Sequence, residues 1–133
     1  MNSEELADKL VVAEIGARYC DACDRQDWDT AVGLFSEDAQ LDATAVYGKA
    51  FTGHGEIRDF FESAPACLGH HATGFFSDIA SASEATAHLK MLTLFKRNTF
   101  TVDYDWELVK ADGQWKIAKQ SFRIIGKQDL VSD

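Results

Sequence analysis

Proline, cysteine and long apolar stretches are all scarce in this sequence. Only one proline occurs in 133 residues, and this composition is typical of a globular chain and not of a disordered one. No stretch approaches the roughly 20 apolar residues that a membrane helix needs. No basic segment followed by an apolar run opens the chain. We therefore expect neither membrane insertion nor secretion.

The three cysteines are odd in number, and together with the missing signal pattern they indicate a reducing compartment. A cytoplasmic protein without disulfide bonds is expected. Cys20 and Cys23 have a C-x-x-C spacing, but no second pair completes a tetrahedral metal site. We interpret both as small thiols that face the core.

Basic residues are outnumbered, with 13 lysines and arginines against 22 aspartates and glutamates, which gives a formal net charge of −9. A field of this sign repels phosphate backbones and anionic lipid headgroups. We therefore expect no nucleic-acid partner and no membrane partner.

The chain is rich in core-forming residues, with 46% hydrophobic and 11% aromatic side chains. A chain of this length buries one sizeable core but is too short to divide comfortably into two. No internal repeat or linker is visible. We expect a single domain over residues 1–133.

Helical patterns fill the first half of the sequence. Residues 3–25 predict a long first helix, and a short second helix is expected from Asp27, whose side chain can cap it. The segment G-H-G-E-I-R-D-F-F-E-S-A-P, from Gly53, predicts a third helix that ends before Pro65. The apolar stripe expected to bury the first helix has steps of three and four: Leu6, Leu10, Ala13, Ala17 and Cys20.

Extended patterns dominate the second half. A short strand is expected over 39–45, and longer strands near 69–80, 85–96, 99–110 and 114–126. The A-D-G sequence at 111–113 predicts the turn of a hairpin.

Three helices followed by a strand meander predict an α+β fold, in which a strongly curved, mostly antiparallel sheet wraps the helices into a cone. Trp28, Phe35, Phe60 and Phe61 are expected to be buried between the layers. The outer face of the sheet, to which we assign Leu92 and Leu94, is left apolar in part. A homodimer through that face is therefore expected.

Asp24 is the first candidate for a functional residue. It continues the apolar stripe of the first helix at a step of four after Cys20, so its carboxylate should point inward and needs a partner. A structural alternative stays open, in which Asp24 ends the first helix in solvent or caps the second.

His70 and His71 open the first long strand. Alternation along a strand turns one imidazole inward and the other outward, and the sequence leaves open which is which. Adjacent histidines on a regular strand cannot both bind one metal ion, so no metal site is expected. An inward histidine held in one tautomer by Asp24 suits a general base near neutral pH, while a hydrogen-bonded core histidine is the alternative.

Arg123 shares strand parity with Trp115, Ile117 and Ile125, which predicts an inward guanidinium. Such an arginine needs an anion, either an internal carboxylate or an anionic or carbonyl-bearing ligand. His88 is expected to face outward.

Several segments together carry a family resemblance. Tyr19 and Asp24, D-W-D at 27–29, L-F-S-E-D-A at 34–39, H-H-A-T-G at 70–74 and D-G-Q-W-K-I at 112–117 resemble SnoaL-like proteins of the nuclear transport factor two-like superfamily. The most similar types are the scytalone dehydratases and bile-acid dehydratases, in which a tyrosine and an aspartate of the first helix pair with a strand histidine. The resemblance implies catalytic roles for Tyr19, Asp24 and His70 or His71, with Arg123 as the last-strand arginine.

This resemblance implies a dehydratase that needs no cofactor. The histidine would remove a proton α to a carbonyl of a hydrophobic cyclic substrate and water would leave, while Tyr19 polarises the carbonyl or assists the leaving group. Trp28 and Phe60 would help to hold the ring. Two alternatives stay open: a ketosteroid-isomerase-like isomerase or polyketide cyclase, and a non-catalytic ligand-binding protein or module like a dioxygenase β subunit.

Overall fold

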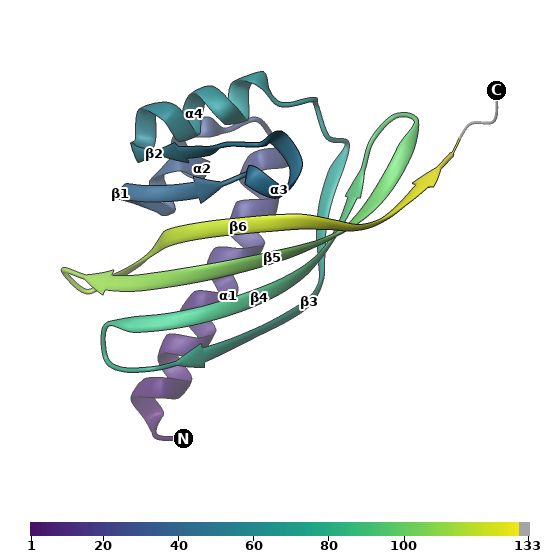
Figure 1. Ribbon diagram of the computed structural model, residues 1–133. Helices are drawn as coiled ribbons and strands as arrows, with labels where there is room; N and C mark the ends of the chain where they lie inside the picture. The colour runs from purple at the N-terminus through teal and green to yellow at the C-terminus, as the bar shows by residue number, and fades with distance from the viewer. Residues whose placement is uncertain (131–133) are drawn as a thin grey trace.

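The structure, a computed structural model, describes residues 1–130 as helices packed on one sheet (Figure 1). The last three residues of the expected domain lie outside the described part. The helices are α1 (Ser3–Asp24), α2 (Trp28–Gly33), α3 (Thr44–Tyr47) and α4 (Gly53–Ser63). The strands are β1 (Phe35–Asp42), β2 (Ala50–Thr52), β3 (Gly69–Ile79), β4 (Glu84–Leu94), β5 (Asn98–Ala111) and β6 (Gln114–Asp129).

The strands form a six-stranded sheet in the order β2-β1-β6-β5-β4-β3. The β3–β6 meander is antiparallel throughout, and β1 joins it by pairing parallel to β6 and antiparallel to β2. Figure 1 shows the curved, unclosed sheet, with α1 crossing one face and α2 and α4 beside β1 and β2. The α+β architecture with a curved, mostly antiparallel sheet is confirmed.

The buried face of α1 differs from the expected one. Leu6 and Leu10 are 54% and 68% exposed, whereas Val12, Ile15 and Tyr19 are buried. The helix packs along β3, and a Cβ at Gly16 would lie 3.2 Å from the ring of Phe75 on that strand, so the buried face follows this close approach. The stripe through Leu6, Leu10, Ala13 and Ala17 was therefore wrong, but the line of Val12, Gly16, Cys20 and Asp24 at steps of four still turns Asp24 toward the sheet.

The segment between α1 and α4 contains more and shorter elements than the sequence pattern indicates. Asp27 caps α2 as expected, because its carboxylate accepts the Thr30 backbone N–H at 3.2 Å. The helix ends at Gly33, and Phe35 begins β1, where it is buried as expected. The strand expected over 39–45 therefore lies earlier, and α3 and β2, which were not predicted, follow it.

A β-bulge in β6 decides which of its side chains face the helices. Glu107 pairs with Lys119 but Leu108 pairs with Ile117, so Ala118 is the extra residue. The bulge shifts the alternation by one residue: Ile117 faces inward before it, and Gln120 and Phe122 face inward after it. This shift builds one wall of the cavity described below.

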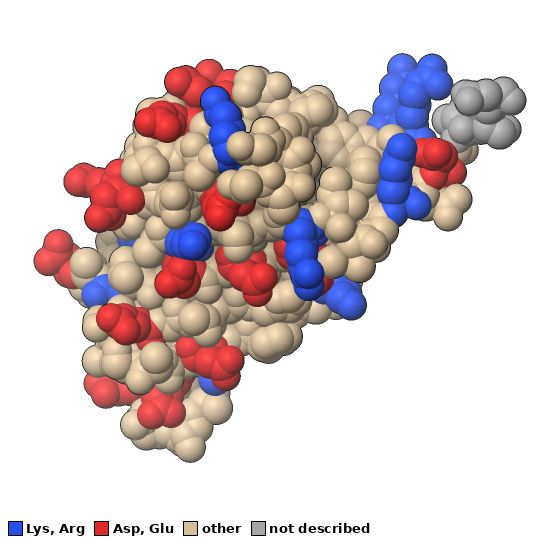
Figure 2. All heavy atoms as spheres, viewed as in Figure 1, with Lys and Arg blue, Asp and Glu red and all other residues tan. Residues whose placement is uncertain are grey.

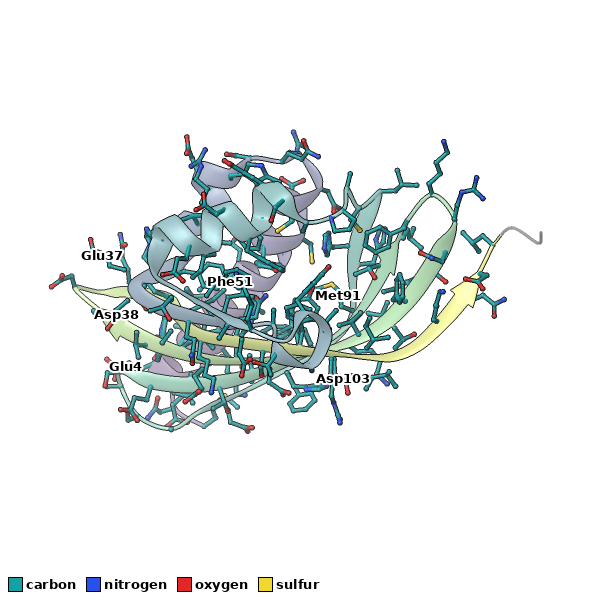
Figure 3. All side chains as sticks on the ribbon, turned by 45° about the horizontal axis from the view of Figure 1, so that its top comes forward. Glu4, Glu37, Asp38, Phe51, Met91 and Asp103 are labelled. Atoms are coloured by element: carbon teal, nitrogen blue, oxygen red, sulfur yellow. The ribbon has the colours of Figure 1, made fainter. Side chains whose placement is uncertain are left out.

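The two faces of the sheet differ in chemistry. Figure 3 shows Met91 and Phe51 on the side of the helices and Asp103 on the opposite side. Met91 is fully buried in one continuous core, which also holds Trp106, Leu89 and Phe35. Phe61 is buried as expected, whereas Trp28 and Phe60 are only half-buried because they border a cavity.

Charges are spread unevenly over the surface. Figure 2 shows acidic side chains over much of the visible face, while basic ones gather at the projecting end formed by the β4–β5 turn and the end of β6. Lys96, Arg97 and Lys127 belong to these segments. No helix among residues 1–130 combines the length and the apolarity needed to cross a membrane.

Candidate active site

A cavity of about 690 Å³ lies between the helices and the concave face of the sheet. Its walls come from the end of α1, from α2, α3 and α4, and from β3 to β6. Six of its lining side chains are aromatic rings without a hydroxyl group: Trp28, Phe60, Phe61, Phe95, Phe100 and Phe122. The Trp28 and Phe61 rings stack at 5.5 Å between centroids, and Phe60 packs against Phe51 at 4.8 Å. Such a cavity suits an apolar ligand of moderate size.

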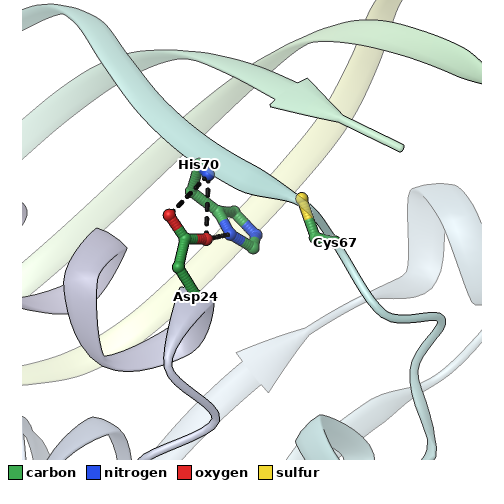
Figure 4. A group of neighbouring side chains, drawn as sticks. All are labelled: Asp24, Cys67 and His70. Carbon is green, nitrogen blue, oxygen red and sulfur yellow. Dashed lines mark hydrogen bonds and ion pairs between the residues drawn. The ribbon is translucent and has the colours of Figure 1, made fainter. Parts of the chain in front are cut away.

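Asp24 and His70 meet at the edge of this cavity. The Nδ1 atom of His70 lies 2.7 Å from Oδ1 of Asp24. The backbone N–H of His70 also donates to both carboxylate oxygens, at 2.9 and 3.0 Å (Figure 4). Asp24 is the last residue of α1, where the helix dipole disfavours a negative charge, so these bonds offset an unfavourable position. The inward orientation expected for Asp24 is observed.

The hydrogen bonds define the state of the His70 ring. An ionised carboxylate only accepts, so Nδ1 carries the proton and Nε2 presents its lone pair. Nε2 makes no hydrogen bond within the described residues, and His70 lines the cavity. A group placed in the cavity can therefore give a proton to Nε2.

His71 is the outward member of the histidine pair. It is exposed, while His70 keeps only 15% of its side chain accessible. The His71 ring folds back over Gly69, where an added Cβ would lie 2.7 Å from its Nε2. The alternation expected for the two histidines is observed, and it is His70 that faces the cavity.

Tyr19 is buried in the same wall, one and a half helical turns before Asp24. Its hydroxyl accepts a hydrogen bond from Nε2 of Gln120 at 3.1 Å, and its ring meets the His70 ring edge-on at 6.4 Å. Burial raises the pKa of the Tyr19 hydroxyl well above its usual value. The group therefore keeps its proton at neutral pH and serves as a hydrogen-bond donor.

The cysteines of the C-x-x-C sequence are buried, as expected, and unpaired. Burial raises the pKa of the Cys20 thiol to about 11 and that of Cys23 to about 12. Neither thiol is activated for nucleophilic chemistry, which needs the thiolate.

A third cysteine was not singled out in the sequence. The Cys67 sulfur lies beside the His70 ring (Figure 4), and within residues 1–130 the ligand atoms of Asp24, Cys67 and His70 form a group within 4.8 Å of one another. However, the Cys67 thiol donates to the carbonyls of Gly69 and Leu94, at 3.2 and 3.3 Å. Asp24 is likewise engaged by His70. Metal binding here would break these bonds, and only three protein ligands would replace them.

The inward orientation expected for Arg123 is wrong. The bulge at Ala118 turns its side chain to the outer face, where it is 69% exposed and its guanidinium lies 3.5 Å from Asp103. Gln120 and Phe122 occupy the inner face instead. A sequence of alternating residues does not reveal a bulge, so Gln120 was missed.

His88 lies on the outer face, as expected. Its Nδ1 lies 2.9 Å from the Asp105 carboxylate, and its ring stacks on Phe76 at 5.1 Å. It contributes nothing to the cavity.

The fold and this site define a class of protein: an α+β cone that encloses an aromatic-lined cavity with a paired histidine and aspartate at its edge. The chain belongs to the SnoaL-like domain family, whose pattern it matches over residues 4–120. No curated protein sequence matches it significantly.

Solved structures share the fold over nearly the whole chain. Hexachlorocyclohexane dehydrochlorinase LinA-type3 from Novosphingobium barchaimii LL02 is similar with a TM-score of 0.86 at 16% identity, over 98% of this chain and 94% of that one. A proposed scytalone dehydratase from Novosphingobium aromaticivorans DSM 12444 gives 0.79 at 19% identity, over 100% and 94%. An NTF2-like protein of unknown function from Pseudomonas putida KT2440 gives 0.76 at 13%, over 89% and 87%. At these identities the likeness establishes the fold alone.

Proposed function

We propose that the protein is a lyase-type enzyme that removes a proton α to a carbonyl of a hydrophobic cyclic substrate and eliminates water. The observation that carries this proposal is the 2.7 Å contact between Nδ1 of His70 and Asp24, which leaves Nε2 free at the wall of an aromatic cavity. A base in this position needs no further group to activate it.

The reaction balances with this chain's own residues. Nε2 of His70 takes the α-proton, and the electron pair of the C–H bond moves into an enolate. The enolate then expels the β-hydroxyl group, which leaves as water after taking the proton back from Nε2. Asp24 stabilises the imidazolium that exists between these steps, and the Tyr19 hydroxyl donates to the carbonyl oxygen. No cofactor is needed for this sequence of steps.

The lining of the cavity supports an uncharged, apolar substrate. Among the described residues no lysine or arginine lines it, and Glu62 is its one acidic side chain. An anionic group would find no countercharge there. Trp28 and Phe60 both pack against Phe61 in the aromatic wall and are proposed to contact the substrate ring.

Two solved structures with this fold carry the names of enzymes that catalyse eliminations, a dehydrochlorinase and a proposed dehydratase. Both names describe the loss of a small molecule from a carbon framework, a reaction that a positioned base can start by removing a proton. This agreement supports elimination over the isomerase or cyclase alternative. The presence of the His70–Asp24 pair also weighs against the alternative of a purely ligand-binding module.

The test is a panel of cyclic β-hydroxyketones incubated with the protein in H₂O and in D₂O and followed by mass spectrometry. Elimination lowers the substrate mass by one water, whereas isomerisation leaves it unchanged. Exchange of the α-hydrogen for deuterium reports proton removal alone. His70→Ala is expected to abolish both signals, and the matched control His71→Ala to keep them. Equal activity in the two variants would overturn the proposal.

A further inference from the structure

Gln120 is buried, and its hydrogen bonds link the core to the cavity. Its side chain is 1% exposed, it lines the cavity, and it bonds to two partners. The indole Nε1 of Trp106 donates to Oε1 of Gln120 at 2.9 Å, and Nε2 of Gln120 donates to the Tyr19 hydroxyl at 3.1 Å. These two bonds form a hydrogen-bond chain from Trp106 through Gln120 to Tyr19.

The direction of this chain is fixed by its first member. An indole nitrogen can only donate, so the amide of Gln120 must turn its oxygen toward Trp106. Its NH₂ group then faces Tyr19, and because NH₂ also only donates, the Tyr19 oxygen must accept. The proton of the Tyr19 hydroxyl is consequently left for another acceptor.

Tyr19 brings this proton to the cavity. Tyr19 lines the cavity, and its ring meets that of Tyr104, another lining residue, edge-on at 6.0 Å between centroids. Because the Tyr19 oxygen already accepts the hydrogen bond from Gln120, the hydroxyl proton is available to a ligand in the cavity.

We propose that Gln120 is a positioning residue, which orients the Tyr19 hydroxyl so that it donates to a negatively charged ligand oxygen. This inference rests on the proposed function, in which that oxygen belongs to the enolate. The site is pre-arranged, because the bonds that orient the hydroxyl exist within the protein before a ligand binds. Trp106 does not line the cavity; its indole N–H sets the direction of the Gln120 amide, and its ring packs edge-on against Tyr19 at 5.6 Å.

Binding of small phenols tests the inference without turnover, so its failure is distinguishable from failure of the proposed reaction. The probes are 4-nitrophenolate, which presents a charged oxygen, and 4-nitrotoluene, which has similar size and no charge. Trp28 in the cavity wall provides a fluorescence signal for both. Tyr19→Phe and Gln120→Leu are each expected to lower the affinity for 4-nitrophenolate about tenfold, the factor for one hydrogen bond to a charged acceptor. Binding of 4-nitrotoluene should stay within about twofold.

Two further variants separate positioning from simple support of the fold. Gln120→Leu made in the Tyr19→Phe protein is expected to cause little additional loss of phenolate affinity, because the two residues act as one unit. Trp106→Phe removes the group that orients the amide and should lower the preference for phenolate over 4-nitrotoluene. Tyr47 also lines the cavity but takes no part in the hydrogen bonds that link Trp106, Gln120 and Tyr19. Tyr47→Phe is therefore the matched control and should leave that preference unchanged.

The proposal is overturned if Gln120→Leu weakens both probes equally, or if its effect on phenolate is the same with and without Tyr19. It is also overturned if Trp106→Phe leaves the preference for phenolate intact. Circular dichroism of each variant, together with its affinity for 4-nitrotoluene, shows that the cavity is still formed.

Discussion

The carboxylate of Asp24 and the imidazole of His70 stand 46 residues apart in the chain and 2.7 Å apart in the structure. One closes α1 and the other opens β3, so the close packing of this helix along this strand creates the pair. The same carboxylate accepts the backbone N–H of His70, which holds strand and ring together. Asp24 thus acts on the chemistry of His70 and on its position at once.

We predict that Asp24→Asn lowers turnover by about four orders of magnitude, the loss seen when an orienting carboxylate is replaced in another histidine system. Asparagine keeps the size, but its neutral amide no longer stabilises a charged imidazole. Thermal unfolding should change little, because the variant also relieves a negative charge at a helix C-terminus. The measurement is kcat together with the melting temperature. An unfolded variant, or one with near-full activity, would make Asp24 a structural residue only.

A second prediction contrasts the aromatic wall with the arginine of the outer face. Phe60→Ala should raise KM and leave the pH dependence of kcat unchanged, because it removes ring contacts and no proton-transfer group. Full burial of an aromatic ring contributes about 3 kcal/mol at most. Because Phe60 is only half-buried, we expect its substitution to cost less than this in substrate-binding free energy. Arg123→Ala is the matched control and should alter kcat/KM by less than about twofold, within the range of ordinary surface substitutions. A large loss of activity in Arg123→Ala would show that the outer face takes part in the reaction.

The meander was predictable because its signals are local. Alternation of apolar residues places β3 to β6 within a few residues of their observed bounds. The hairpin at 111–113 follows from turn chemistry, since Asp112 and Gly113 both adopt positive φ angles of 52° and 75°. Such patterns depend only on neighbouring residues, so they can be recognised in the sequence without knowledge of the tertiary packing.

The features that the sequence did not predict depend on contacts between distant segments. The buried face of α1 is set by the approach of Gly16 to Phe75 of β3. The spacing of apolar residues along the helix does not reveal this contact. The bulge at Ala118 lies in the pairing of β6 with β5, and it moves Gln120 into the cavity and Arg123 out of it. The pairing of Asp24 with a histidine was implied by family resemblance, and only the structure distinguishes His70 from His71.

A third prediction concerns association through the outer face of the sheet. Leu92 and Leu94 lie half-buried there, as expected, and Phe76 on neighbouring β3 is 61% exposed. We predict a homodimer through this face, because exposed apolar surface of this kind usually marks an interface. Light scattering should give twice the chain mass, and Leu92→Arg should reduce it to that of a monomer.

Leu10→Arg is the control for the dimer. Leu10 is 68% exposed on α1, which covers the inner face, so its substitution should leave the dimer intact. A monomer at all micromolar concentrations, or a dimer broken by Leu10→Arg and not by Leu92→Arg, would refute the predicted interface.

The last prediction uses the buried thiols. Burial raises the pKa of Cys20 to about 11 and that of Cys23 to about 12, whereas a thiol in an unfolded chain has a pKa of about 8.5. Below this value both states are protonated and these groups give no pH dependence. Above it the unfolded state loses its protons first, so the free energy of unfolding must fall as pH rises, by up to about 1.4 kcal/mol per pH unit and group.

Urea unfolding between pH 7 and pH 10.5 measures this decline, and a variant with Cys20→Ala and Cys23→Ala should show a flatter one. The buried tyrosines add to the decline as the pH approaches about 10, where an unfolded tyrosine ionises, but both proteins contain them, so the difference between the two slopes isolates the thiols. In the folded protein at pH 8, a thiol reagent should modify half-buried Cys67 before Cys20 or Cys23, because only the thiolate reacts and access is needed. An unchanged slope in the double variant, or rapid labelling of Cys20 and Cys23 at pH 8, would mean that the two thiols are open to solvent and that α1 does not pack against β3 as described.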